Sequence, residues 1–167
     1  QSAAKLKTLY TKLDEPTREM LESHQWLTPT NNGIPRLQKP LLLYWAIVVS
    51  LKSFGLTTAA VRLPIAFATF AAVAFTFLIG DRLGGPWRGF LAGLIHLCCC
   101  GAFLLGRIVM PEPVFSAFIA GSIYCAIRGY ERRPGRRGWF IGFWIFVALA
   151  CMTKSLHGLI YPAAILG

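Results

Sequence analysis

Lys39 stands immediately before an apolar segment and is a candidate phosphate-binding residue. It begins Lys39-Pro40-Leu41-Leu42-Leu43-Tyr44-Trp45, and tyrosine and tryptophan favour the headgroup region of a bilayer. A lysine at that depth would meet the phosphate of a lipid, such as a polyprenyl phosphate, and bind it through charge-assisted hydrogen bonds. The alternative is a lysine that only extends from a helix start to water.

Glu112 lies between two prolines, after Arg107 in Arg107-Ile108-Val109-Met110-Pro111-Glu112-Pro113. The prolines should end one helix and begin the next, so the acid is expected at the mouth between two spans. An ionisable residue near membrane depth is a functional candidate. Alternatively, Glu112 is an acid in the first turn of a helix, favoured by the helix dipole and paired with Arg107.

Lys154 interrupts a long apolar stretch within Thr153-Lys154-Ser155. It must therefore mark an interface or a polar cavity, where it could bind an anion, or else it is an ordinary turn lysine. The histidines His24, His96 and His157 have no ligand-like spacing, and His96 is better explained as a hydrogen-bonded helix residue. We predict no metal and no cofactor.

The elements that carry these residues are predicted to be transmembrane helices. The chain is 55% hydrophobic and 14% charged, which excludes a soluble enzyme of this length. Uncharged runs near the length of a membrane span recur. They are 63–80, 89–106, 113–127, 138–153 and 155–167. Residues 1–39 are polar and rich in turn residues, and Pro40–Leu51 is expected to lie along the membrane surface.

Two basic turns set the predicted topology. Asp81–Arg88 and Arg128–Arg137 are separated by two spans, so they lie on one side, which the positive-inside rule makes cytoplasmic. The charge of +10 is thus a topology signal rather than a nucleic-acid-binding signal. Residues 1–39, Glu112 and Lys154 then share the external face. If Pro40–Leu51 instead crosses the membrane, residues 1–39 are cytoplasmic.

Several short motifs occur in a fixed order along the chain. They are Asp14-Glu15-Pro16, Arg18-Glu19-Met20-Leu21, Trp26-Leu27-Thr28-Pro29, Asn32-Gly33, Lys39-Pro40, Leu43-Tyr44-Trp45, Arg62-Leu63-Pro64 and Thr153-Lys154. The ordered set resembles the dolichyl-phosphate-mannose protein mannosyltransferase-like family, which includes the bacterial aminoarabinose transferases that modify lipid A. The resemblance implies an all-α, polytopic membrane protein with the glycosyltransferase C-type fold and a large external first loop.

The resemblance also implies roles for individual residues. Asp14 or Glu15 would be the catalytic acid of the first external loop, although this pair lies closer to the Arg-Glu-Met-Leu segment than is usual in the family. Glu112 would be the second acid. Lys39 and Lys154, with Arg107, would face the donor phosphate. Gln38 stands where the aminoarabinose transferases carry a glutamate, which also argues against a metal there.

The implied function is transfer of a sugar from a polyprenyl-phosphate donor to a lipid or protein acceptor at the external face of a bacterial inner membrane. Fixed cations would stabilise the departing phosphate, and Asp14 would accept the proton of a hydroxyl acceptor. Membrane lipids are the other expected partners, and nucleic acid is not one. The competing hypothesis is a non-catalytic transporter or assembly subunit whose charges only set topology.

We expect two parts, an external loop region at 1–61 and a transmembrane region at 62–167. The first residue is Gln1 and the last apolar run continues to Gly167, so we also expect the N-terminal part of a longer protein.

The predicted topology can be tested with single cysteines introduced as Asn32→Cys and Arg132→Cys in an otherwise cysteine-free protein. In intact cells, an impermeant thiol reagent should label position 32, whereas position 132 should react only after permeabilisation. Labelling of both positions from the same side would contradict the topology and the grouping of the candidate residues.

Overall fold

The computed structural model describes residues 30–31, 34–35, 42–55, 57–99, 110–131, 136–154 and 156–166. The chain divides into two compact units, Gln1–Pro64 and Ile65–Gly167. The division falls inside helix α4, which begins at Thr58, so the expected boundary at 61/62 also lies within this helix.

The first unit contains a minimal β-hairpin and a short apolar helix. Strands β1 (Thr30–Asn31) and β2 (Ile34–Pro35) pair antiparallel, with Thr30 opposite Pro35. Helix α3 (Leu42–Phe54) buries residues spaced three or four apart, as expected for one helix face. They are Leu43, Tyr44, Ile47, Val48 and Leu51. The helix continues past the expected end at Leu51 and stops at Gly55, whose φ of 78° suits glycine.

Helix α4 (Thr58–Gly84) begins before Arg62-Leu63-Pro64, where the sequence analysis placed the start of the first span. The Thr57 hydroxyl accepts a hydrogen bond from the Ala60 amide at 3.1 Å and caps the earlier start. Pro64 therefore lies inside the helix and has no N–H for the Ala60 carbonyl. The Ser50 hydroxyl of α3 donates to that carbonyl at 2.6 Å instead.

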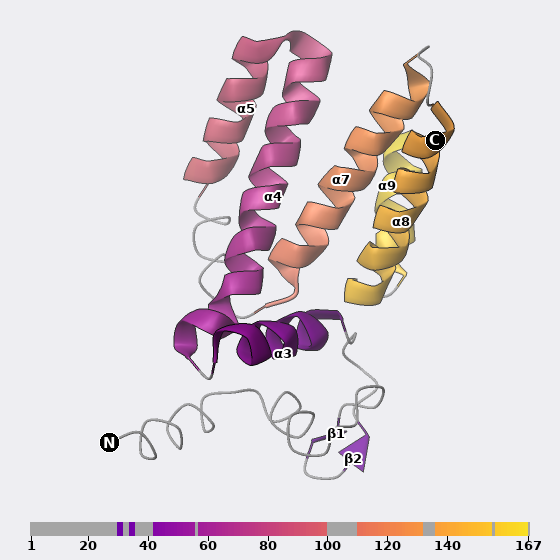
Figure 1. The fold of residues 1–167 in the computed structure, drawn as a ribbon. Coiled ribbons are helices and arrows are strands. Elements are labelled where there is room, and N and C mark those ends of the chain that lie inside the picture. Colours follow the sequence, from indigo (N-terminus) through magenta and orange to yellow (C-terminus); the bar gives the residue numbers. More distant parts are fainter. Residues whose placement is uncertain are drawn as a thin grey trace. The chain divides into compact units, whose positions relative to one another are not determined.

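Among the described residues, the second unit is a set of packed helices, α4 from Ile65 onward and four later helices (Figure 1). Their bounds are α5 Pro86–Cys98, α7 Glu112–Tyr130, α8 Arg136–Lys154 and α9 His157–Leu166. Helices α4 and α8, the latter from Arg137, are long and apolar enough to cross a membrane. At about 1.5 Å per residue, α4 is about 40 Å long and exceeds a hydrocarbon layer of about 30 Å.

The turns between helices are shorter than the sequence suggested. Helix α4 runs through Asp81 and Arg82, and Gly85 alone, at φ 86°, separates it from Pro86 at the start of α5. Likewise, α7 extends beyond Ile127 to Tyr130, so Arg128 is helical. Charged residues predict the ends of the spans, but both helices carry charged residues in their last turns, and α4 is also longer than the hydrocarbon layer.

Helices α4 and α5 form a close antiparallel hairpin. A Cβ atom at Gly80 would lie 2.8 Å from the Cα atom of Gly89, so these positions exclude side chains. Thr76 Oγ1 lies 2.8 Å from His96 Nδ1 between the two helices, which confirms the expectation that His96 is a hydrogen-bonded helix residue.

Helices α7 and α8 are also antiparallel. Phe140 packs on Gly129 and Phe146 on Gly121, while Phe75 of α4 contacts Phe146 edge-on at a centroid distance of 5.5 Å. Large apolar side chains, including Phe67, Phe70 and Trp144, remain exposed on the helices. Such exposure suits lipid contact and is unusual for a soluble protein.

The Ser50 contact predicts a stability effect that depends on Pro64. Ser50→Ala should lower the free energy of unfolding by about 1–3 kcal/mol, because it leaves a buried carbonyl unpaired. In a Pro64→Ala background, the restored N–H should satisfy that carbonyl, so the same substitution should cost clearly less. Ser53→Ala is the control, since that exposed hydroxyl bonds only its own helix, at Val49. Equal costs for Ser50→Ala in both backgrounds would contradict this account.

Candidate functional site

Of the six candidate site residues, Glu112 and Lys154 lie among the described residues. Asp14, Glu15, Lys39 and Arg107 lie outside them, and their roles remain predictions. The described pair belongs wholly to the second unit, so its geometry can be built from helices α7 and α8.

Glu112 and Lys154 form an ion pair between two helix ends. Lys154 Nζ donates to Glu112 Oε1 at 3.3 Å. Glu112 is in the first turn of α7 and Lys154 in the last turn of α8, where the helix dipoles favour an acid and a base respectively. Because the helices are antiparallel, residues 42 positions apart meet.

The sequence predicts both side chains on one face, with Arg107 as the partner of Glu112. The signal for the observed pair was available, since a short connection between α7 and α8 requires the beginning of one to meet the end of the other. The pair accounts structurally for both residues, as an acid and a base at helix ends that also bond each other.

The two carboxylate oxygens of Glu112 have different surroundings. Oε1 accepts the lysine hydrogen bond, whereas Oε2 is buried and has no hydrogen-bond partner among the described residues. A buried acceptor without a partner costs free energy. Oε2 is thus an acceptor suited to a hydroxyl donor.

Lys154 has several close neighbours. Its ammonium group lies 5.8 Å from the centroid of the Phe115 ring, and His157 Nδ1 is 3.2 Å from its carbonyl oxygen. The Lys154 side chain is 43% exposed and that of Glu112 is 36% exposed. Such an accessible pair contributes only about 0–1 kcal/mol to stability, so an incoming phosphate can replace the carboxylate at low cost.

Residues 38–166 match the dolichyl-phosphate-mannose-protein mannosyltransferase family. The chain belongs to this family. Its match covers Lys39, Arg107, Glu112 and Lys154, and begins after Asp14 and Glu15.

A curated relative of this mannosyltransferase-family chain is the undecaprenyl phosphate-alpha-4-amino-4-deoxy-L-arabinose arabinosyl transferase of Yersinia enterocolitica. It is 31% identical over 160 residues, which are 91% of this chain and 28% of the relative. The chain therefore spans less than a third of that protein's length.

Two crystal structures of ArnT from Cupriavidus metallidurans have the same fold. The apo structure has a TM-score of 0.82 at 23% identity and covers 99% of this chain and 34% of ArnT. The structure bound to undecaprenyl phosphate has a TM-score of 0.83 at 22% identity and covers 98% of this chain and 34% of ArnT. The expected fold is confirmed: an all-α, polytopic membrane fold of the glycosyltransferase C type, with the two-residue strands β1 and β2 as a minor addition.

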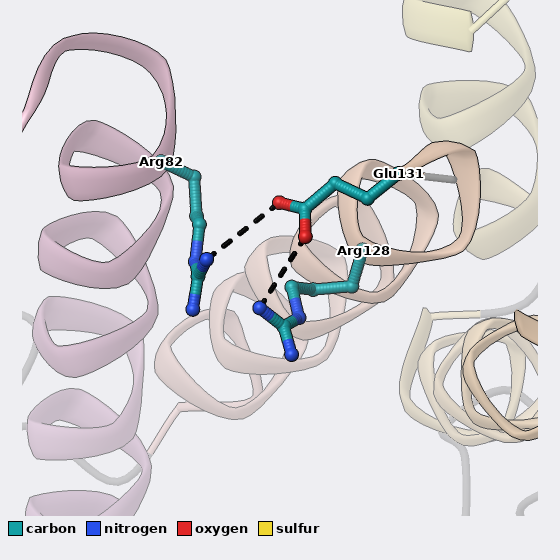
Figure 2. Close-up of polar contacts among 3 residues, drawn as sticks. All are labelled: Arg82, Arg128 and Glu131. Atoms are coloured by element: carbon teal, nitrogen blue, oxygen red, sulfur yellow. Dashed lines mark hydrogen bonds and ion pairs between the residues drawn. The ribbon is translucent and has the colours of Figure 1, made fainter. Parts of the chain in front are cut away.

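A polar group that the sequence analysis missed lies at the other end of α7. Arg128 and Glu131 are there, and Arg82 of α4 joins them (Figure 2). The sequence identified the arginines only as topology signals. Its one usable clue was Glu131, an acid three residues after Arg128 on the same helix face.

Proposed function

We propose that this chain is part of a membrane glycosyltransferase that moves a sugar from a polyprenyl-phosphate donor to a lipid or protein acceptor at the external face of a bacterial inner membrane. The observation that carries the proposal is the family match, which includes the basic residues Lys39, Arg107 and Lys154. The name of the Yersinia relative, an undecaprenyl phosphate-aminoarabinose transferase, supports a lipid-phosphate donor. It also favours an enzyme over a transporter or assembly subunit.

In the proposed reaction, the bond between the sugar and the donor phosphate breaks, and a bond from the sugar to an acceptor oxygen forms. Polyprenyl phosphate leaves with the electron pair. Lys39, Arg107 and Lys154 stabilise the charge that develops on it, as fixed cations do better than bulk water. Lys154 would leave Glu112 and bind the donor phosphate, because the two anions compete for one ammonium group.

The carboxylates act on the acceptor side. Asp14, or Glu15 next to it, takes the proton from a hydroxyl acceptor as general base. For a phosphate acceptor, which brings no such proton, the acid instead positions the acceptor. When Lys154 moves to the donor phosphate, Glu112 Oε1 loses its hydrogen bond. Both carboxylate oxygens of Glu112 can then accept hydrogen bonds from the molecule that receives the sugar.

Lys39→Ala and Lys154→Ala in the complete protein should each raise the apparent donor requirement by about tenfold or more, since each removes a charge-assisted bond to phosphate. Lys154→Ala should change the free energy of unfolding by only about 0–1 kcal/mol. Steady-state transfer with a polyprenyl-phosphate sugar measures the first effect and denaturant unfolding the second. Lys52→Ala, at the end of α3, is the control. Unchanged donor kinetics in both variants would remove these lysines from the donor site.

Asp14→Asn should abolish most transfer activity with little loss of expressed protein. The substitution removes the basic carboxylate but keeps a side chain of nearly the same size that can still accept hydrogen bonds. Glu15→Gln is the paired variant. If Asp14→Asn retains full activity and Glu15→Gln does not, the catalytic acid is Glu15, and full activity of both would place the base elsewhere.

A further inference from the structure

A second charged cluster lies far from the Glu112–Lys154 pair. Arg82 Nη1 is 3.8 Å from Glu131 Oε1, and Arg128 Nη1 is 3.4 Å from Glu131 Oε2. Figure 2 shows both guanidinium groups directed at this one carboxylate. Arg128 is near the end of α7, and at about 1.5 Å per residue about 24 Å of helix separates it from Glu112.

Arg128 is held in place from several sides. Its side chain is 17% exposed, and its guanidinium carbon is 4.8 Å from the centroid of the Trp139 ring of α8, a cation–π geometry. Trp139 in turn meets Tyr124 edge-on at 5.8 Å. The Arg128 Nε atom is buried and has no hydrogen-bond partner among the described residues. This cation is therefore fixed in position and incompletely satisfied.

The cluster has more positive charge and more donors than its acid can satisfy. Two guanidinium groups share Glu131, and each has several N–H donors, while a carboxylate has about four acceptor sites. Arg82 is accessible, with 31% of its side chain exposed. Arg88 and Arg137, on the neighbouring turns, are exposed as well but are not part of this cluster. The surplus donors are suited to a further anion with several oxygens.

The residues around the cluster indicate that its surplus N–H donors lie at the level of lipid headgroups. In the second unit, the α4–α5 turn and the C-terminal end of α7 lie at the same end of the helices (Figure 1). At the α4–α5 turn, Trp87 stacks on Phe90 at 5.9 Å, and the two are 69% and 51% exposed. Tyr130 is exposed at the end of α7. Exposed aromatic residues beside arginines are typical of the boundary between hydrocarbon and headgroups.

We propose that Arg82 and Arg128 bind the headgroup phosphate of an anionic phospholipid at this boundary, with the acyl chains along the exposed apolar surface of the helices. Arginine suits this ligand because its planar donor group binds two phosphate oxygens at once. Glu131 competes with the phosphate for the same donors and thereby limits the affinity. The site goes beyond the proposed transferase function and is separate from its donor site, which lies at the opposite end of α7.

The test is a lipid titration of the complete, purified protein in detergent. Phosphatidylglycerol, phosphatidylcholine with the same acyl chains, and inorganic phosphate are the three titrants, and binding is measured by native mass spectrometry and by the shift of the melting temperature. Wild-type protein should bind phosphatidylglycerol preferentially. Arg82→Gln should weaken phosphatidylglycerol binding about fivefold, since one surface cation is lost. Arg88→Gln removes the same charge outside the cluster and should weaken the binding by less than about twofold.

Glu131→Gln tests whether the two arginines bind lipid or only hold the helix ends together through Glu131. Removal of the competing carboxylate should strengthen phosphatidylglycerol binding, and misfolding cannot imitate such a gain. Lys154→Ala should leave it unchanged, which keeps this result independent of the donor site. Equal binding of both phospholipids, equal effects of Arg82→Gln and Arg88→Gln, or weaker binding after Glu131→Gln would each overturn the proposal. Stabilisation by inorganic phosphate as strong as that by phosphatidylglycerol would indicate a free-anion site and overturn the lipid assignment.

Discussion

A bilayer requires each backbone polar group at its interior to find a partner within the protein, and much of this structure follows from that constraint. At Pro64 the helix itself cannot supply the partner, and Ser50 of a neighbouring helix does so. Polar side chains also need partners there, and Thr76 and His96 face each other across a hairpin. Polar side chains here supply hydrogen bonds that water could supply in a soluble protein.

The charged groups obey a related rule, because ions avoid hydrocarbon and gather at the ends of helices. Helix α7 has Glu112 in its first turn and Arg128 in its last. Each end forms a bridge to another helix, to α8 through Lys154 and to α4 through Arg82. One 19-residue helix thus joins two chemically different sites. The first pairs one cation with one anion, and the second holds more cations than anions.

Much of this could be predicted from the sequence, because apolar runs and basic turns are direct consequences of the bilayer. The family resemblance rested on ordered motifs such as Lys39-Pro40 and Thr153-Lys154, and the family match supports it. Helix ends were harder, since Pro64 suggested a start and Asp81 an end, but Thr57 capping and the length of α4 override both signals. The Glu112–Lys154 pair could have been inferred from the short connection between α7 and α8. The Arg82–Glu131 pair depends on a tertiary contact between distant positions, which local patterns do not encode.

The single-residue turn at Gly85 limits how the sequence of this protein can vary in evolution. Because no loop separates α4 from α5, the rotation of one helix fixes that of the other. Inserting or deleting one residue between Thr76 and Gly85 would rotate the start of α5 by about 100° relative to Thr76. It would separate Thr76 from His96 and bring side chains to the Gly80–Gly89 crossing. This hairpin should therefore accept substitutions on its lipid-facing side while keeping a constant length.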